Sequence, residues 1–401
     1  MRVLLLCGVF ATENEAEVIK NSKRTVEFSA NVFQQKLISG LNCCVKELDV
    51  ISAPFIGSYP NAYSKLTFNG FEVAQNKYRY VNFNNLWGFR NYSRACSLKK
   101  SLNEFISCED DDKIIIVYSP HTPFVQAAAY AKKKDPRIKI CLIVPDLPQY
   151  MNLNAKKSIL YRVGKKYDIF KFNKSNALVD SYVLLTDAMR NKIDIHGCPY
   201  IVVEGIVDPN ALRSCSRDIQ TEEKQPRERY IVYTGKLNEK FGVKDLVDSF
   251  TALPYEDCRL ILCGNGDVFE YAKEKAEADK RIVLLGQVTP DVAREWVAKA
   301  DVLVNPRKND EEYTKYSFPS KNIEYLASGN PVVAYMLDGM KPLYSEFLYS
   351  VDRNLEETLS YVLSRTKEEL QNNRKSFREY AANCLSAEKV AKQIIDLNTR
   401  T

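Results

Sequence analysis

The segment Ser317–Val333 reads SFPSKNIEYLASGNPVV and predicts a helix with a clear start and a clear end. Pro319 suits the first helical position, because that position needs no backbone N–H and the φ angle of proline is already helical. Gly329 then ends the helix, and Pro331 prevents it from resuming. The free N–H groups and the positive dipole end at such a helix start predict a site for phosphate oxygens.

The carboxylate of Glu324 lies well inside this predicted helix. Its neighbours Ile323, Leu326 and Ala327 are apolar, which predicts an apolar setting for the charge. A carboxylate in such a setting needs hydrogen-bond donors, because an unpaired buried charge is costly. A pair of ribose hydroxyls would supply suitable donors.

Strand-like apolar runs alternate with helical stretches in both halves of the chain. Examples are RVLLLCGVF, KIIIVYS and IKICLIVP in the first half, and RYIVYTG, CRLILCG and ADVLVNP in the second. This alternation predicts an α/β protein with parallel sheets covered on both faces. Because 401 residues exceed one ordinary core, two Rossmann-like domains are expected. The predicted domains are 1–213 and 214–385, with the polar stretch 214–229 as linker and a last helix at 386–401.

Composition and charge are those of a soluble globular protein, with 45% hydrophobic and 27% charged residues. The opening MRVLLLCGVF predicts a buried strand rather than a signal peptide, and no apolar run approaches the roughly 20 residues that span a bilayer. Residues 1–213 hold 29 Lys and Arg against 20 Asp and Glu, whereas the rest is slightly acidic, so different partners are expected for the two halves. Eleven cysteines without a CxxC pair favour reduced thiols in a cytoplasmic protein.

The pattern FPSKxxEYLASGxPVV resembles the nucleotide-binding segment of retaining nucleotide-sugar glycosyltransferases of family 4, the glycosyl transferases group 1, in particular bacterial capsule and exopolysaccharide members. The resemblance implies the GT-B fold, in which two Rossmann-like domains face each other across a cleft. In that family a Glu-x7-Glu pair spans the segment, and the second glutamate, which Glu324 matches, holds the ribose of the donor. The first glutamate of the pair would fall at Tyr316, which has no carboxylate. In addition, Pro319 stands where many relatives have glycine.

The segment Tyr233–Phe250, YTGKLNEKFGVKDLVDSF, resembles the GRLxxxKG loop of the same family, whose Arg and Lys hold the donor diphosphate. Lys236 takes the Arg position and is expected to stabilise the charge that develops on the leaving diphosphate. Lys240 lies one residue before the family's Lys position, which Phe241 occupies here. Either lysine could also be ordinary solvated surface.

The resemblance implies further donor contacts in the second half. The Gly264–Gly266 turn in LCGNGD corresponds to a family GxG turn, although an ordinary tight turn also fits. Arg307 is either a donor contact or an ion-pair partner of Asp310 or Glu311. The predicted donor-binding residues are Gly235, Lys240, Gly264, Gly266, Gln287, Val288, Arg307, Ser317, Phe318, Pro319, Ser320, Lys321 and Glu324, with the backbone at Gln287 and Val288 at the place of the base.

Two residues in the first half follow predicted strands, where α/β sheets present functional groups. His121 corresponds to a family histidine near the sugar, and with a reference pKa near 6.5 it could hydrogen-bond hydroxyls in either protonation state. A loop histidine satisfied by backbone is the alternative. Asp146 matches an acidic position that orients the acceptor, or it caps a helix. His121, Asp146 and Lys236 are the predicted catalytic residues, whereas His196 in IHGCP predicts a turn.

The stretch 154–175 interleaves basic and aromatic residues. It predicts either peripheral contact with an anionic membrane, where a lipid-linked acceptor would lie, or a surface helix whose aromatics face the core. No nucleic-acid recognition pattern accompanies it. The acidic run at 109–112 precedes a strand and predicts a solvated turn, so no metal is expected.

The resemblance implies a hexosyltransferase-type enzyme that moves a sugar from a nucleoside diphosphate sugar to a hydroxyl of a glycan or lipid-linked acceptor. A UDP-sugar is the donor expected before other nucleotide sugars, and surface polysaccharide synthesis is the expected setting. No cofactor is expected. The protein is expected in the cytoplasm, at the inner face of the cell membrane if 154–175 binds lipid. Two alternatives stay open: a sugar-nucleotide epimerase of the same fold, and a binding subunit that has lost chemistry because Tyr316 replaces a glutamate.

Overall fold

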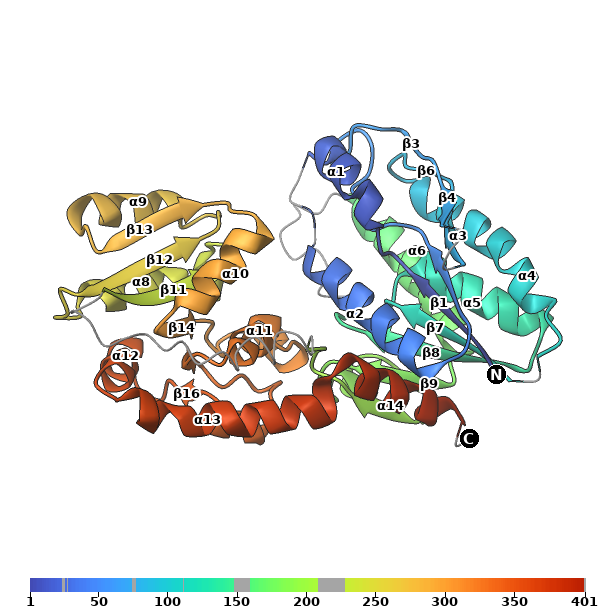
Figure 1. Cartoon of the computed structure of the whole chain (residues 1–401). Coiled ribbons are helices and arrows are strands. Elements are labelled where there is room, and N and C mark those ends of the chain that lie inside the picture. The colour runs from blue at the N-terminus through green and yellow to red at the C-terminus, as the bar shows by residue number, and fades with distance from the viewer. Residues whose placement is uncertain are drawn as a thin grey trace. The chain divides into compact units, whose positions relative to one another are not determined.

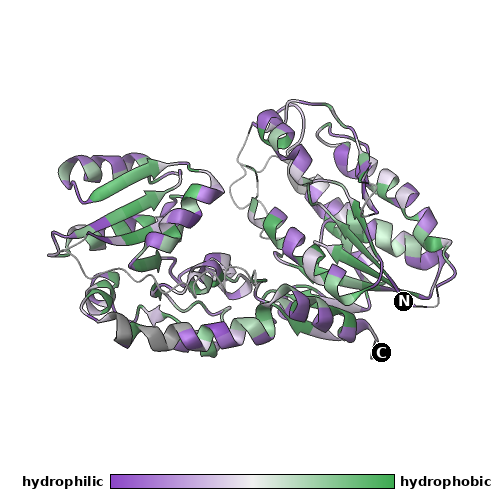
Figure 2. Ribbon diagram, in the orientation of Figure 1, coloured by the Kyte–Doolittle hydropathy of each residue, from purple (hydrophilic) through white to green (hydrophobic). Residues whose placement is uncertain are grey.

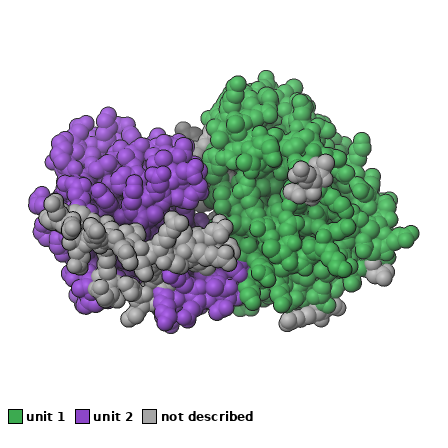
Figure 3. Space-filling view, in the orientation of Figure 1, with its two compact units in different colours: residues 1–206, 387–401 green, residues 207–386 purple. Residues whose placement is uncertain are grey.

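The computed structural model describes residues 1–23, 26, 28–73, 77–110, 112–147, 159–207 and 228–399. These residues form two compact units, shown in Figure 3: unit 1 is Met1–Ile206 with Ala387–Thr401, and unit 2 is Val207–Ser386. Each unit has its own mainly parallel sheet with helices around it (Figure 1), so the predicted α/β class with two Rossmann-like domains is confirmed. The expected domain boundary at 213/214 lies outside the described residues.

The sheet of unit 1 has the order β10-β9-β8-β7-β1-β2-β5-β4. It is parallel except for β4, which pairs antiparallel with β5. In register, Val3 lies opposite Leu48 on one side and Ile114 on the other. The strands are β1 (Arg2–Cys7), β2 (Leu48–Ser52), β4 (Phe71–Val73), β5 (Tyr78–Tyr80), β7 (Lys113–Tyr118), β8 (Ile138–Val144), β9 (Ser181–Leu184) and β10 (Tyr200–Val202), while β3 (Thr67–Phe68) and β6 (Phe83–Asn84) form a separate pair.

The helices of unit 1 cover this sheet, whose strands appear green, hence hydrophobic, in Figure 2. They are α1 (Thr12–Asn21), α2 (Phe28–Cys44), α3 (Arg90–Ser101), α4 (Asn103–Ile106), α5 (Thr122–Lys134), α6 (Ile159–Asn176), the short η2 (Asp187–Asn191) and α14 (Ala387–Thr399). Helix α14 packs on α2, where Gly40 has no side chain and a Cβ would lie 2.0 Å from the Ala387 carbonyl oxygen. Ser181 Oγ donates to Asn398 Oδ1 at 2.8 Å. The end of the chain is therefore part of unit 1.

The sheet of unit 2 has the order β13-β12-β11-β14-β15-β16 and is parallel throughout. The strands are β11 (Arg229–Thr234), β12 (Cys258–Cys263), β13 (Ile282–Gly286), β14 (Val302–Asn305), β15 (Val332–Ala334) and β16 (Tyr349–Ser350). The helices are α8 (Val243–Thr251), α9 (Phe269–Ala278), α10 (Pro290–Lys299), α11 (Ser320–Ser328), α12 (Leu355–Leu363) and α13 (Lys367–Tyr380), with short turns η3 (Glu239–Phe241), η4 (Glu312–Tyr316), η5 (Pro342–Glu346) and η6 (Ala381–Leu385).

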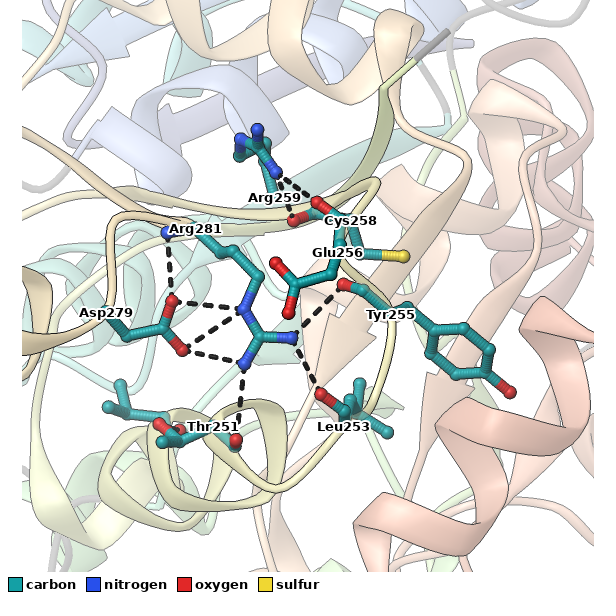
Figure 4. A network of polar contacts seen from close by, with 9 residues as sticks. Thr251, Leu253, Tyr255, Glu256, Cys258, Arg259, Asp279 and Arg281 are labelled. Carbon is teal, nitrogen blue, oxygen red and sulfur yellow. Dashed lines mark hydrogen bonds and ion pairs between the residues drawn. The ribbon is translucent and has the colours of Figure 1, made fainter. Parts of the chain in front are cut away.

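An arginine clamp closes the edge of unit 2 at which β13 begins (Figure 4). Arg281 donates to the carbonyl oxygens of Leu253 at 2.7 Å, Tyr255 at 3.1 Å and Thr251 at 3.2 Å, and pairs with Asp279 at 2.8 Å. The planar guanidinium has donors enough to satisfy all of these oxygens at once. The clamp joins the loop after α8 to the start of β13, so this edge serves stability.

Both sheets reverse their chain order at one point. In unit 1 the first strand, β1, lies between β2 and β7, and in unit 2 the first strand, β11, lies between β12 and β14. Ligands of open α/β sheets bind outside the carboxyl ends of the strands at such switch points. In unit 1 this point lies at the loops after β1, β2 and β7, and in unit 2 it lies at the loops after β11 and β14.

Candidate functional site

Two glycines directly follow neighbouring strands at the carboxyl edge of the sheet in unit 2. Gly235 follows β11 and donates its N–H to the Cys263 carbonyl at 2.8 Å, while Gly264 follows β12 and donates to the Gly286 carbonyl at 2.7 Å. Their φ angles are +145° and +147°, which favour glycine, and a Cβ on Gly264 would lie 1.7 Å from the Gly235 carbonyl oxygen. The third predicted glycine, Gly266, lies in the same turn. This edge exposes backbone to which a ligand can approach closely.

Lys321, in the first turn of α11, lies over this glycine edge. Its Nζ donates to Thr234 Oγ1 at 3.2 Å, and its Cε lies 2.7 Å from the place of a Cβ on Gly235. The buried hydroxyl of Tyr325, one turn later, accepts from the Thr234 backbone N–H at 2.9 Å. The start of α11 is thus tied to the end of β11, with an ammonium group beside free helix N–H groups, an arrangement suited to phosphate. The sequence analysis did not predict the contacts of Thr234 and Tyr325. The one-turn spacing of Tyr325 from Lys321 could have indicated that Tyr325 lies on the same side of the helix.

The described helix corrects two expectations about its residues. Pro319, with φ −74° and ψ 94°, is the residue before the helix, which begins at Ser320, whereas Gly329 at φ +77° ends it as predicted. Glu324 is exposed, not surrounded by apolar side chains. Ile323 and Tyr325, the neighbours of Glu324 in sequence, are both buried. The 3.6-residue helical period places Glu324 on the outward face, together with Ser320 and Lys321. The desolvation argument for Glu324 is therefore wrong, and its carboxylate is open to a ligand.

Arg307, after β14, lies among polar and aromatic side chains. Its Nη2 donates to Ser317 Oγ at 2.9 Å, and its guanidinium carbon lies 4.9 Å from the Tyr313 ring centroid and 5.7 Å from that of Phe241. Its Nε is buried and has no partner among the described residues. Within the described part of the chain it forms no ion pair with the acidic residues at 310–311, so that alternative is wrong. Arg307 orients Ser317 at the approach to α11.

The remaining predicted donor residues surround this edge. Lys236 and Lys240 are exposed, with Lys240 Nζ 5.2 Å from the Phe241 ring centroid and the Lys236 carbonyl accepting from the Tyr233 hydroxyl at 2.9 Å. Phe318 is buried, with its ring 5.0 Å from that of Tyr344. Gln287 and Val288 directly follow β13, the outer strand of the sheet. The side chain of Phe318 therefore serves packing, whereas both lysines are open to solvent.

His121 occupies the equivalent edge of unit 1. It follows β7 and precedes the first residue of α5, with its ring centroid 5.9 Å from that of Phe55 and 5.6 Å from that of Phe124. Burial, then the positive charges of Arg94, Arg90 and Lys165, lowers its pKa to about 3. The imidazole is therefore neutral near pH 7, and the expectation of hydrogen bonding in either protonation state is wrong. Phe55 and the two arginines were not predicted from sequence, because α3 and the loop after β2 carry no motif.

Asp146 and His196 differ in their setting. Asp146 lies two residues after the end of β8 and is exposed. Burial, and then the charge of Asp146, raises the pKa of the Tyr118 phenol. The helix it would cap lies outside the described residues. His196 has φ +49° and its Nδ1 lies 3.1 Å from Asp194 Oδ2, so the predicted turn is confirmed. Asp146 shares the carboxyl edge of the sheet with His121.

The basic stretch 154–175 is described from residue 159 onward, as the larger part of α6. Tyr167 is 59% and Phe170 65% exposed, whereas Phe172 is buried. Lys171 Nζ lies 4.4 Å from the Tyr167 ring centroid. The alternative that its aromatics face the core therefore holds for Phe172 and is wrong for the other two. In the described part of the chain no helix is long and apolar enough to cross a membrane, and no three His, Cys, Asp or Glu side chains are grouped to hold a metal.

The comparisons with known proteins fit this geometry. Residues 228–355, from the residue before β11 to the first of α12, match the family model of glycosyl transferases group 1. No curated protein matches the chain in sequence.

Several solved structures share the fold of the whole chain. Sucrose-phosphate synthase from Thermosynechococcus elongatus is 13% identical to this chain, with a TM-score of 0.62. The match covers 100% of this chain and 99% of the synthase chain. Anabaena Alr3699/HepE in complex with UDP is 12% identical with a TM-score of 0.61, covering 100% of both chains. The lipopolysaccharide outer core galactosyltransferase WaaB is 14% identical with a TM-score of 0.58, covering 99% of both. Residues 228–355 therefore carry a glycosyl transferases group 1 domain, and the whole chain has the GT-B fold.

Proposed function

We propose that the enzyme moves a sugar from a UDP-sugar to a hydroxyl of a glycan or lipid-linked acceptor, with retention of anomeric configuration. The observation that carries the proposal is the meeting of Lys321, the glycine edge and exposed Glu324 on one side of unit 2, within the matched domain. Solved structures of the same fold include Alr3699/HepE in complex with UDP and with UDP-glucose, which supports the donor class.

Each donor contact follows from the charge and position of its residue. The start of α11 and Lys321 bind the diphosphate, because an ammonium and free backbone N–H groups converge there. Glu324, one turn further on the same exposed face, accepts hydrogen bonds from the ribose hydroxyls. Lys236 on the loop after β11 stabilises the charge that develops as the diphosphate leaves. The backbone at Gln287 and Val288 contacts the base.

The chemistry follows from which groups can accept a proton. When the bond between the anomeric carbon and the phosphate oxygen breaks, negative charge develops on the diphosphate. That oxygen takes the proton of the acceptor hydroxyl as the new glycosidic bond forms on the same face. His121 is neutral and hydrogen-bonds a hydroxyl, and Asp146 orients the acceptor. No strong protein base is needed in this route. The proposed setting is surface polysaccharide synthesis, in the cytoplasm and at the inner face of the membrane.

The first experiment is a thermal-shift screen of the full chain against UDP, GDP, ADP and CDP and their sugar conjugates. A ligand at about 100 times its dissociation constant adds roughly 2.7 kcal/mol to the free energy of unfolding. We expect UDP and one UDP-sugar to raise Tm, and the Lys321→Ala variant to lose the rise. Stabilisation by another diphosphate alone would overturn the UDP assignment.

Turnover then separates the transferase from its rivals. We expect release of UDP that depends on an acceptor, with a product of unchanged anomeric configuration by NMR. Isomerisation of the sugar nucleotide without an acceptor would establish the epimerase. Nucleotide binding without turnover on any acceptor would establish the binding subunit, in line with Tyr316 at the glutamate position.

A further inference from the structure

The side-chain amide of Asn322 is buried at the start of α11. Asn322 is the third residue of the helix and is 0% exposed. Its Oδ1 accepts a hydrogen bond from Asn305 Nδ2 at 2.6 Å, and its own Nδ2 donates to Met340 Sδ at 3.7 Å. A thioether sulfur is a weak acceptor, so the hydrogen bond from Asn305 is the stronger of the two contacts.

Asn305 joins this amide to the sheet of unit 2. It is the last residue of β14 and is 7% exposed. Strand β14 lies beside β11, whose last residue, Thr234, already holds α11 through Lys321 and Tyr325. The start of α11 is therefore fixed twice, at the ends of the two strands that flank the switch point of unit 2.

The loop after β15 supports the same place. Met340 lies in this loop and is 7% exposed, and its backbone N–H donates to the Leu337 carbonyl at 2.9 Å. A Cβ on the neighbouring Gly339 would lie 2.9 Å from the carbonyl oxygens of Ser317 and Thr314, which precede the helix. Such close packing leaves α11 little room to shift, because protein interiors have low compressibility. The amide of Asn322 thus lies where a strand end, a helix start and a loop meet.

A pair of amides at this position gives direction rather than stability. Replacing both partners of a buried hydrogen bond by apolar groups of the same shape changes stability little, because the bond and the cost of burying its groups offset each other. Apolar contact is non-directional, whereas a hydrogen bond has a preferred distance and angle. The N–H groups of a helix start bind phosphate where they point at it, and a binding group has to be held to within about 0.5 Å. The hydrogen bond between Asn305 and Asn322 supplies that constraint for α11.

We propose that Asn305 and Asn322 are positioning residues of the donor site. They act through the N–H groups in the first turn of α11, whose direction their hydrogen bond fixes for the diphosphate. The inference rests on the proposed function, because it takes the start of α11 as the diphosphate site. Without this hydrogen bond the helix keeps its fold and loses affinity for the phosphates.

The test uses the full chain and two probes, UDP and inorganic pyrophosphate, titrated by calorimetry at fixed salt. Asn322→Leu should weaken the binding of both probes about fivefold or more, the scale of coupling within one hydrogen-bond network. The double variant, Asn305→Leu with Asn322→Leu, should weaken binding as much while keeping the Tm of the unligated parent, because it leaves neither buried amide without its partner. Equal losses for the two probes are expected, since the contact affected is to the phosphates and not to the nucleoside.

Asn398→Leu is the matched control. Asn398, in α14 of unit 1, is 2% exposed, and its side chain donates to the Ile394 carbonyl at 2.7 Å and accepts from Ser181 Oγ at 2.8 Å. This substitution should lower Tm, as Asn322→Leu alone does, because each leaves a buried partner unpaired. It should leave the affinity for UDP unchanged, since Asn398 has no contact with α11 or its ties to the sheet.

Three results would overturn the inference. Parent-like affinity for both probes in Asn322→Leu would mean that its amide has no influence on the phosphate site. Recovery of the parent affinity in the double variant would mean that side-chain shape, not the hydrogen bond, positions the helix. An equal loss of affinity in Asn398→Leu would mean that the loss follows general stability.

The failure of this inference can be told apart from that of the proposed function. If Asn322→Leu does not fold, the double variant compared with the parent decides the positioning role. A parent chain that binds neither UDP nor pyrophosphate refutes the donor site itself and the positioning role with it. Binding by the parent with unchanged affinity in the variants refutes the positioning role and leaves the donor site in place.

Discussion

The ammonium nitrogen of Lys321 lies 3.2 Å from the hydroxyl oxygen of Thr234, which joins the first turn of α11 to the end of β11. The same threonine receives a second tie, because its backbone N–H donates to the buried Tyr325 hydroxyl. The position of the cation is therefore set by the sheet before any ligand arrives. Such preorganisation lowers the entropy lost on binding.

Replacing Lys321 with alanine should weaken UDP binding by about 1.5–3 kcal/mol, the range for a hydrogen bond to a charged group. Isothermal calorimetry at fixed salt measures the change. Lys273→Ala is the matched control, because Lys273 is an exposed lysine of α9 in the same unit. Equal losses in both variants would show that general charge, not the position of Lys321, attracts the nucleotide.

Glu324→Gln should weaken UDP binding while leaving the free energy of unfolding within about 0.5 kcal/mol of the parent, because the side chain is exposed. Denaturant titration and calorimetry give the two numbers. The affinity for inorganic pyrophosphate should not change, since it has no ribose. A variant that bound UDP normally would remove Glu324 from the donor site.

Gly264→Ala should lower the free energy of unfolding by about 2 kcal/mol or more, because its Cβ would collide with the Gly235 carbonyl and its φ angle disfavours a side chain. Gly286→Ala is the control. Its φ is +66°, but nothing lies within 4 Å of the added Cβ, so about 1 kcal/mol is expected. Similar costs for both would mean that the glycine edge is not closely packed.

The depressed pKa of His121 predicts a pH-dependent stability. The unfolded chain takes up a proton near pH 6.5, whereas the folded His121 does so only near pH 3. Between these values the unfolded state binds more protons, so the free energy of unfolding falls as the pH falls, by up to about 2 kcal/mol at pH 5. His121→Gln should flatten this dependence between pH 7 and 5. An equally steep curve in His121→Gln would show that the imidazole is protonated in the fold.

The architecture and the α11 region could be predicted because their signals are local. Strand-like apolar runs and the Gly329 stop specify elements over short stretches, and the fold confirms both. The exposure of Glu324 could not be judged from its apolar neighbours, since the helical period places Ile323 and Tyr325 on other faces. Composition around a residue describes its sequence neighbours and not its surroundings in space.

The side chains around His121 show the second limit. Arg90 and Arg94 lie about thirty residues before His121 in sequence, and the loop after β2 brings them together through backbone carbonyls. No motif marks a contact of that kind. The pKa of His121 depends on burial and then on these arginines, so its protonation state could not be inferred from the SPHTPF segment alone.

Helix α14 has a consequence for biosynthesis. Gly40 of α2 lies against Ala387, and Ser181 hydrogen-bonds Asn398, so the first half of the chain lacks part of its packing until residues 387–399 exist. On the ribosome, unit 2 can therefore finish before unit 1, although unit 1 begins the chain. A stop codon shortly before residue 387 would leave the face of α2 that α14 covers open to water. Such a product should aggregate or be degraded even though unit 2 is complete.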